Sequence, residues 1–148
     1  MIYTALFLVI VLADQLIKMI CVNSLQSIET IPLIEGILHF TYVENRGAAF
    51  GIFQNAQVFF IVVTTAVLIG AVIFLKIKKP TQPVLLTSIT LIAAGAVGNL
   101  IDRIFRGYVV DFIDFRVFPV FNIADIAVCC GAALFILYIL FLEKKENE

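Results

Sequence analysis

The amino-acid sequence predicts an all-α membrane protein with four transmembrane helices, for three reasons. Of its 148 residues, 62% are hydrophobic and only 14% are charged. Its mean hydropathy is +1.10, which is far outside the usual range for soluble domains. Four apolar segments have the length of about 20 residues that crosses a hydrocarbon core about 30 Å thick. They cover residues 2–22, about 57–75, about 84–104 and 123–142, all within a single domain of residues 1–148.

The first predicted span, residues 2–22, contains Asp14 and Lys18 and has no basic N-terminal region. A cleaved secretory signal has a basic start and a shorter apolar core. We therefore expect this segment to be retained as a helix. Its two charges are one helical turn apart, a spacing that favours an ion pair on one face.

The segment KIKKPTQP, residues 76–83, is expected to be a hairpin between the second and third spans, because Pro80 and Pro83 end one helix and start the next.

Four spans leave both termini on one side of the membrane. Lys and Arg in short loops mark the cytoplasmic side. The side of the termini carries five lysines, Lys76, Lys78, Lys79, Lys144 and Lys145. The loops on the other side carry three arginines, Arg46, Arg106 and Arg116. This slight bias predicts cytoplasmic termini.

The two connections away from the termini are predicted at about residues 23–56 and 105–121. In the first, ILHFTYV (37–43) is rich in β-branched and aromatic residues, which predicts a strand. The small residues and the length of the segment 37–56, which includes NRGAAFG (45–51), predict that this segment moves over the site. Residues 40–60 and 105–121 hold twelve of the eighteen Phe and Tyr residues. They indicate an aromatic belt at the membrane interface. Two interpretations are equally open: a plain belt, or a belt that also docks a lipidic substrate.

The composition excludes several classes of protein. A formal net charge of −1 gives no basic surface for nucleic acid. The three cysteines are odd in number and lie in or at the end of spans, which argues against a disulfide framework or a cysteine metal site. His39 is the only histidine, so a zinc protease with two histidine ligands is excluded. Its strand-like context places His39 at the surface. We expect neither a metal ion nor a cofactor.

Polar residues of the predicted spans gather at one end of the bundle. Asn99, Asp102 and Arg103 have the i, i+3, i+4 spacing of one helix face at the end of the third span. Asn122 and Asp125 are three residues apart at the start of the fourth. An acidic side chain at the centre of a span costs about 2.5 to 3.5 kcal/mol on insertion scales, and less near the interface. The clustering therefore calls for a structural or a chemical reason.

Structural roles can account for some of these residues. Asp102 can pair with Arg103, and Asn122 can cap the fourth span by accepting from its first amides. Asp111 and Asp125 differ, because neither has a basic residue three or four positions away. These two aspartates are the candidates for chemistry.

A pair of aspartates in one site supports acid–base catalysis. Such carboxyls cannot comfortably both ionise, so they share a proton and titrate as a pair. The ionised one takes a proton from water while the protonated one donates to the carbonyl oxygen under attack, as in aspartic proteases.

Two other functions remain open. A small proton-coupled transporter also uses intramembrane carboxylates, but its polar residues would continue across the membrane. The inner halves of the second to fourth spans offer only hydroxyl residues, such as Thr87, Ser88 and Thr90. A scaffold or assembly factor would depend on no single carboxylate.

Five short motifs follow one another along nearly the whole chain. They are DQLIK (14–18), NRGAAFG (45–51), GNLIDR (98–103), GYVVDFID (107–114) and FNIAD (121–125). In this order they resemble the lipoprotein signal peptidases, or signal peptidase II family. Ile17 departs from the family pattern, in which many members carry a hydroxyl residue there.

The resemblance implies a four-helix aspartyl endopeptidase of the bacterial cytoplasmic (inner) membrane, with cytoplasmic termini and a small extracytoplasmic β-rich cradle and loop. Its substrate would be a diacylglyceryl-modified prolipoprotein, cleaved just before the lipidated cysteine. We expect a monomer in contact with membrane lipids. Asp111 and Asp125 would be the catalytic pair. The residues that support the site or bind substrate would be Asp14, Asn45, Asn99, Arg103 and Asn122.

Overall fold

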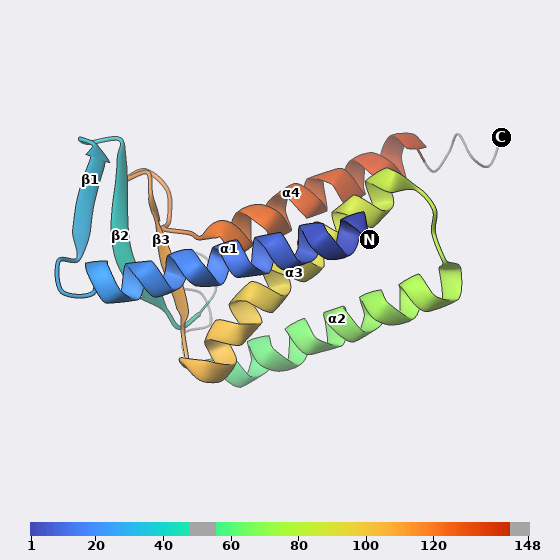
Figure 1. Ribbon diagram of the computed structural model, residues 1–148, viewed down its shortest axis with the longest axis horizontal. Helices are drawn as coiled ribbons and strands as arrows, with labels where there is room; N and C mark the ends of the chain where they lie inside the picture. Colours follow the sequence, from blue (N-terminus) through green and yellow to red (C-terminus); the bar gives the residue numbers. More distant parts are fainter. Residues whose placement is uncertain (48–55, 143–148) are drawn as a thin grey trace.

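Four long helices form a bundle with a small sheet at one end in the computed structural model, which describes residues 1–47 and 56–142 (Figure 1). All four helices are long and apolar enough to cross a membrane, which confirms the predicted architecture. The helices are α1 (Ile2–Leu25), α2 (Gln57–Lys78), α3 (Pro83–Phe105) and α4 (Ile123–Leu137), the last continued by a π-helical segment, η2 (Tyr138–Leu142). The strands are β1 (Thr30–Ile34), β2 (Leu38–Asn45) and β3 (Val109–Asp114).

The hairpin expected between the second and third spans connects α2 to α3. The chain leaves α2 at Lys79, which has a left-handed backbone with φ 45°, and Pro83 occupies the first turn of α3. A proline fits there because the first turn lacks intrahelical partners for its N–H groups. This hairpin, the start of α1 and the end of α4 all lie at the end of the bundle opposite the sheet (Figure 1).

Helix α3 is the centre of the bundle and contacts each of the other three helices. Small residues make these contacts close. A side chain on Gly98 would place its Cβ 2.7 Å from Asp14 Oδ2, and one on Gly131 would come 2.8 Å from Ile92 Cγ1. Ala94 is fully buried. Small residues on α3 and α4 thus allow the helix backbones to approach closely.

Helix α2 is the least covered of the four, since none of its residues is buried. It packs along α3 and stands apart from α1 and α4 (Figure 1). This separation leaves room between α2 and α4, where the candidate site lies.

The sheet is antiparallel in the order β1-β2-β3. The strand predicted at 37–43 is present as β2, whereas β3 arises from the connection 105–121, for which only aromatic enrichment was noted. Val110 and Phe112 of β3 are buried against Cys21 and Leu25 at the end of α1. The sheet is thus fixed to the bundle through its third strand.

His39 corrects one expectation, because it is buried at 5% exposure rather than at the surface. It pairs with Asp114 in the register of β2 and β3. Its Nε2 accepts a hydrogen bond from the Gly36 amide at 3.2 Å, and its Nδ1 has no partner among the described residues. The expected motion of residues 37–56 over the site stays a prediction, and residues 48–55 of this segment lie outside the described part of the chain.

Candidate active site

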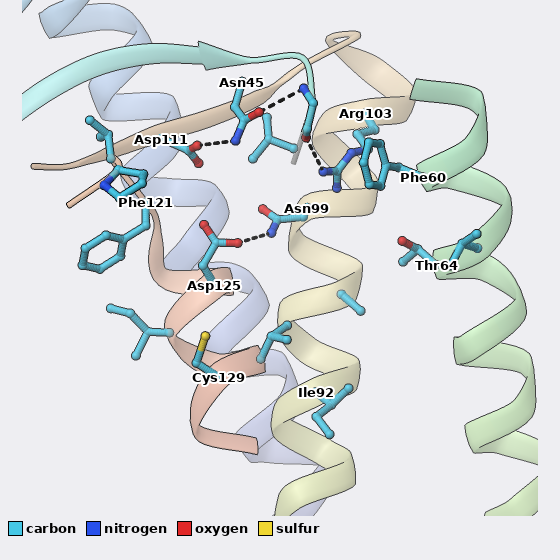
Figure 2. A pocket seen from close by; sticks show the side chains of 18 of the residues that line it. Asn45, Phe60, Thr64, Ile92, Asn99, Arg103, Asp111, Phe121, Asp125 and Cys129 are labelled. Carbon is cyan, nitrogen blue, oxygen red and sulfur yellow. Dashed lines mark hydrogen bonds between the residues drawn. The ribbon is translucent and has the colours of Figure 1, made fainter. Parts of the chain in front are cut away.

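A cavity of about 640 Å³ lies between α2, α3, α4 and the sheet (Figure 2). Asp111, from β3, and Asp125, from α4, both line it. Asn99 and Arg103 reach it from α3, and Phe60 from α2. Away from the sheet its lining is mostly apolar and includes Val67, Ile92 and Val128, with Thr64 of α2 as a hydroxyl residue. The cavity thus joins two carboxylates from separate elements to an apolar space between helices.

The Asp111 carboxylate is held by two amide groups. Asn45 Nδ2 donates to its Oδ2 at 2.9 Å, and Asn122 Nδ2 donates to its Oδ1 at 2.6 Å. Asp111 is only 2% exposed. Burial raises the pKa of this carboxyl to about 7, and the charge of Asp125 acts in the same direction. The two amide donors oppose this rise because they favour the ionised form.

Asp125 occupies the third position of α4 and forms a capping box with Asn122. The Asp125 amide donates to Asn122 Oδ1 at 2.9 Å, and the Asn122 amide donates to Asp125 Oδ2 at 3.2 Å. The predicted N-cap role of Asn122 is therefore confirmed. The other oxygen, Asp125 Oδ1, accepts from Asn99 Nδ2 at 2.7 Å. Both carboxylates are thus oriented by asparagine amides.

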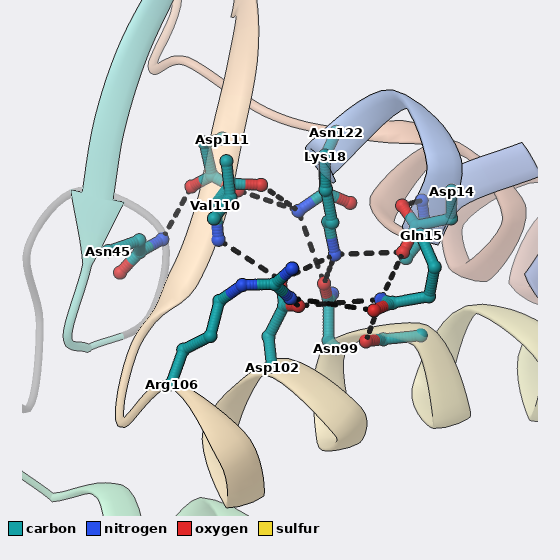
Figure 3. A network of polar contacts seen from close by, with 12 residues as sticks. Asp14, Gln15, Lys18, Asn45, Asn99, Asp102, Arg106, Val110, Asp111 and Asn122 are labelled. Atoms are coloured by element: carbon teal, nitrogen blue, oxygen red, sulfur yellow. Dashed lines mark hydrogen bonds and ion pairs between the residues drawn. The ribbon is translucent and has the colours of Figure 1, made fainter. Parts of the chain in front are cut away.

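A fully buried charge cluster lies behind the carboxylates, between α1 and α3 (Figure 3). Lys18 Nζ is 2.9 Å from Asp14 Oδ2 and 3.0 Å from Asp102 Oδ2. The predicted Asp14–Lys18 ion pair is therefore confirmed. Lys18 also donates to Asn99 Oδ1 at 2.9 Å. This bond fixes which end of the Asn99 amide faces Lys18, so that its NH₂ group faces Asp125.

Asp14 and Asp102 also hold backbone amides next to the site. Asp14 Oδ1 accepts from the amide of Ala124 at 2.9 Å, at the start of α4. Asp102 Oδ2 accepts from the amide of Val110 at 3.1 Å, beside Asp111 on β3. Asp14 does not line the cavity and instead bonds the first turn of α4, the helix that carries Asp125.

Arg103 corrects a second expectation, because Asp102 pairs with Arg106 and Lys18 instead of with Arg103. Adjacent residues on a helix do not face each other, whereas residues four apart do. Arg103 instead faces the cavity. Its guanidinium lies 4.9 Å from the centre of the Phe60 ring, and its Nη2 donates to the Gly47 carbonyl at 3.4 Å. It therefore links α3 to α2 and to the chain after β2.

The sequence interpretation missed Gln15 as part of this network. Its Nε2 donates to the Gly98 carbonyl at 3.0 Å and lies within hydrogen-bond distance of Asp14 and Asp102, at 3.2 and 3.4 Å. A polar side chain next to Asp14 within an apolar span was a signal that could have identified it.

These features define an integral membrane protein with a buried polar site beneath a small sheet. The signal peptidase II family model matches residues 6–141 of the chain. The chain therefore belongs to the signal peptidase II family, a family of peptidases.

Individual relatives are similar along almost their whole length. A lipoprotein signal peptidase of Halothermothrix orenii is 46% identical over 137 residues, which cover 93% of this chain and 94% of the relative. A lipoprotein signal peptidase of Clostridioides difficile is 43% identical over 149 residues and covers 99% of this chain and 100% of the relative.

Solved structures share the fold. A bacterial membrane enzyme determined by the in meso method superposes with a TM-score of 0.87 at 33% identity, covering 99% of this chain and 90% of the other. A second structure of a bacterial membrane enzyme gives a TM-score of 0.85 at 34% identity, covering 95% of this chain and 93% of the other.

Proposed function

We propose that this protein is an intramembrane aspartyl endopeptidase that removes the signal peptide from diacylglyceryl-modified bacterial prolipoproteins by cleaving just before the lipidated cysteine. The observation that carries the proposal is that Asp111 and Asp125 line one cavity and are joined through Asn122. Membership of the signal peptidase II family and the names of the relatives support the substrate class.

The proposed reaction is hydrolysis of one peptide bond by a water molecule held between the two aspartates. The ionised carboxylate takes a proton from the water as its oxygen attacks the carbonyl carbon, and the protonated carboxyl donates to the carbonyl oxygen. When the tetrahedral intermediate collapses, the C–N bond breaks and the leaving nitrogen takes the proton that the first carboxylate received from water. A hydroxyl of the intermediate returns its proton to the other carboxylate, so the pair again shares one proton. The raised pKa of Asp111, about 7, supports a proton shared between the two carboxyls at neutral pH.

The polar residues around the pair are proposed to orient both the carboxylates and the substrate. Asn45, Asn99 and Asn122 already donate to the carboxylates, which leaves them placed beside a bound peptide. The Arg103 guanidinium faces the cavity and offers several donors for peptide carbonyls. A peptide that leaves water needs such replacement hydrogen bonds.

The proposed placement is in the bacterial cytoplasmic membrane as a single-domain monomer, with cytoplasmic termini and the site near the extracytoplasmic face. The sheet lies at the end of the bundle opposite the start of α1, which supports this placement (Figure 1). Asp111 is on the third strand of the sheet and Asp125 is in the first turn of α4. The hydroxyls of Ser88 and Thr90, deeper in α3, donate to carbonyls of their own helix. This use of the hydroxyls argues against the transporter alternative, which would need a polar path across the bilayer.

The test is a gel-shift cleavage assay in nanodiscs with a diacylglyceryl-modified prolipoprotein. We expect the wild type to cleave and Asp111→Asn and Asp125→Asn to be inactive, with cooperative thermal unfolding that shows both variants to be folded. Asp114→Asn is the matched control, because Asp114 lies on the same strand but pairs with Arg116 and Thr41 outside the cavity. Activity in either dyad variant would remove that residue from the mechanism. A folded wild type without activity would overturn the proposed function.

A further inference from the structure

A second cavity of about 280 Å³ lies between α2 and α3 and is lined by apolar residues alone. Its walls include Gly70 and Phe74 of α2, Ala93 of α3 and Phe135 of α4. Two residues, Val67 and Ile92, line both this space and the cavity that holds the aspartates. The two spaces therefore adjoin, and we call the second one the α2–α3 groove.

The groove runs away from the aspartates along the bundle. On α3 it reaches Ile89, ten residues before Asn99, and on α4 it reaches Phe135, ten residues after Asp125. At 1.5 Å per residue, both helices place its far end about 15 Å from the level of the carboxylates. One leaflet of a hydrocarbon core about 30 Å thick has the same depth. The groove therefore has the reach of a lipid acyl chain.

We propose that the α2–α3 groove binds one acyl chain of the substrate's diacylglyceryl group. This inference rests on the proposed function, which puts the lipidated cysteine directly after the scissile bond. The glyceryl group would then lie in the cavity beside Asp111 and Asp125, at the mouth of the groove. An acyl chain that is tethered to the bound substrate at this point enters the groove in an intramolecular step. Its effective concentration is therefore high, which favours its binding over that of a free membrane lipid.

Small residues keep the groove open. A Cβ built on Gly70 meets no atom within 4 Å, so the space beside this glycine is unfilled. The variant Gly70→Leu therefore adds a side chain to the groove without a clash, and leucine is a better helix former than glycine. The control Ile69→Phe adds bulk to a neighbouring side chain that is 55% exposed and lines neither cavity.

The experiment measures kcat/KM in nanodiscs for one prolipoprotein carrying either dipalmitoyl or dihexanoyl glyceryl, since the hexanoyl chains are too short to fill the groove. A leucine that displaces about two methylenes should lower kcat/KM of Gly70→Leu for the dipalmitoyl substrate about tenfold. For the dihexanoyl substrate, kcat/KM of Gly70→Leu should stay within about twofold of the wild-type value. Ile69→Phe should leave both unchanged.

Three outcomes would overturn the acyl site while leaving the proposed function intact. They are an equal loss for both substrates, no loss for either, and a loss that follows the chain length of the nanodisc phospholipid instead of that of the substrate. The last would assign the groove to a membrane lipid. Failure of the wild type to cleave either substrate would instead overturn the proposed function, and the acyl site with it.

Discussion

The side-chain amide of Asn122 lies 2.6 Å from Asp111 Oδ1, so the residue that caps α4 also orients a carboxylate on β3. The same residue donates its backbone amide to Asp125 Oδ2. Asn122 is fully buried, so water cannot replace these bonds. The relative position of the two aspartates therefore depends on one asparagine.

Two variants of Asn122 should separate capping from orientation. Asn122→Ser retains an N-cap oxygen but loses the amide donor to Asp111. We expect a loss of about 1 to 3 kcal/mol of stability from the unpaired buried oxygens, and a tenfold to hundredfold lower kcat, which corresponds to the strength of a hydrogen bond to a charged group. Asn122→Ala should lose about 1 kcal/mol of stability in addition. Thermal unfolding and kcat of both variants check this. Wild-type kcat in Asn122→Ser would contradict it.

Asp111 should make stability depend on pH. Its pKa is raised from 3.8 to about 7 in the folded protein, because burial disfavours the charged form. Between these values the folded state holds a proton that the unfolded chain has released. The contribution to the free energy of unfolding is therefore fully present below about pH 4, falls as pH rises toward 7, and is constant above. The free energy of unfolding measured from pH 4 to 8 should fall in this way in the wild type. In Asp111→Asn the part of this decrease that comes from Asp111 should be absent.

Lys18 should contribute far more to stability than an exposed cation. Lys18→Met leaves two buried carboxylates without their shared partner, so we expect a loss of about 3 to 5 kcal/mol. Arg46→Met is the control, because Arg46 pairs with Glu44 while 58% exposed and such pairs contribute about 0 to 1 kcal/mol. Thermal unfolding in detergent compares them. Similar losses in the two variants would contradict the role of the buried cluster.

Two glycine-to-alanine substitutions, at Gly95 and Gly70, should change the free energy of unfolding by different amounts. A Cβ on Gly95 would overlap the Ala124 carbonyl and come 2.8 Å from Val128 Cγ2, so Gly95→Ala should separate α3 from α4 and cost about 1 to 3 kcal/mol. Gly70→Ala meets open space and should be neutral or slightly stabilising. Unfolding of the pair provides the measurement, and equal destabilisation would show that this contact between helices is not tight.

The four helices could be predicted because their signal is local, as apolar length and flanking prolines lie within each segment. Strand β3 could not, because VVDFID is a short apolar run and its partner β2 lies about 66 residues away, as the Asn45–Asp111 bond shows. The two aspartates were singled out because they lack nearby bases along the chain. The bond from Lys18 to Asn99 was not foreseen, because it joins residues 81 positions apart.

The buried charge cluster also has a consequence for biosynthesis, since α1 is made before α3. Asp14 and Lys18 lie on α1, while Asp102 lies on α3 and pairs with Arg106, the C-cap residue of that helix, each pair at i, i+4 spacing. Each of these aspartates therefore has a base four residues away before the helices meet, and the bond between Lys18 and Asp102 forms once both helices have arrived. With Asp14→Asn the first helix would carry a lone cation into lipid, and glycosylation mapping of the nascent chain should then report poorer insertion of α1.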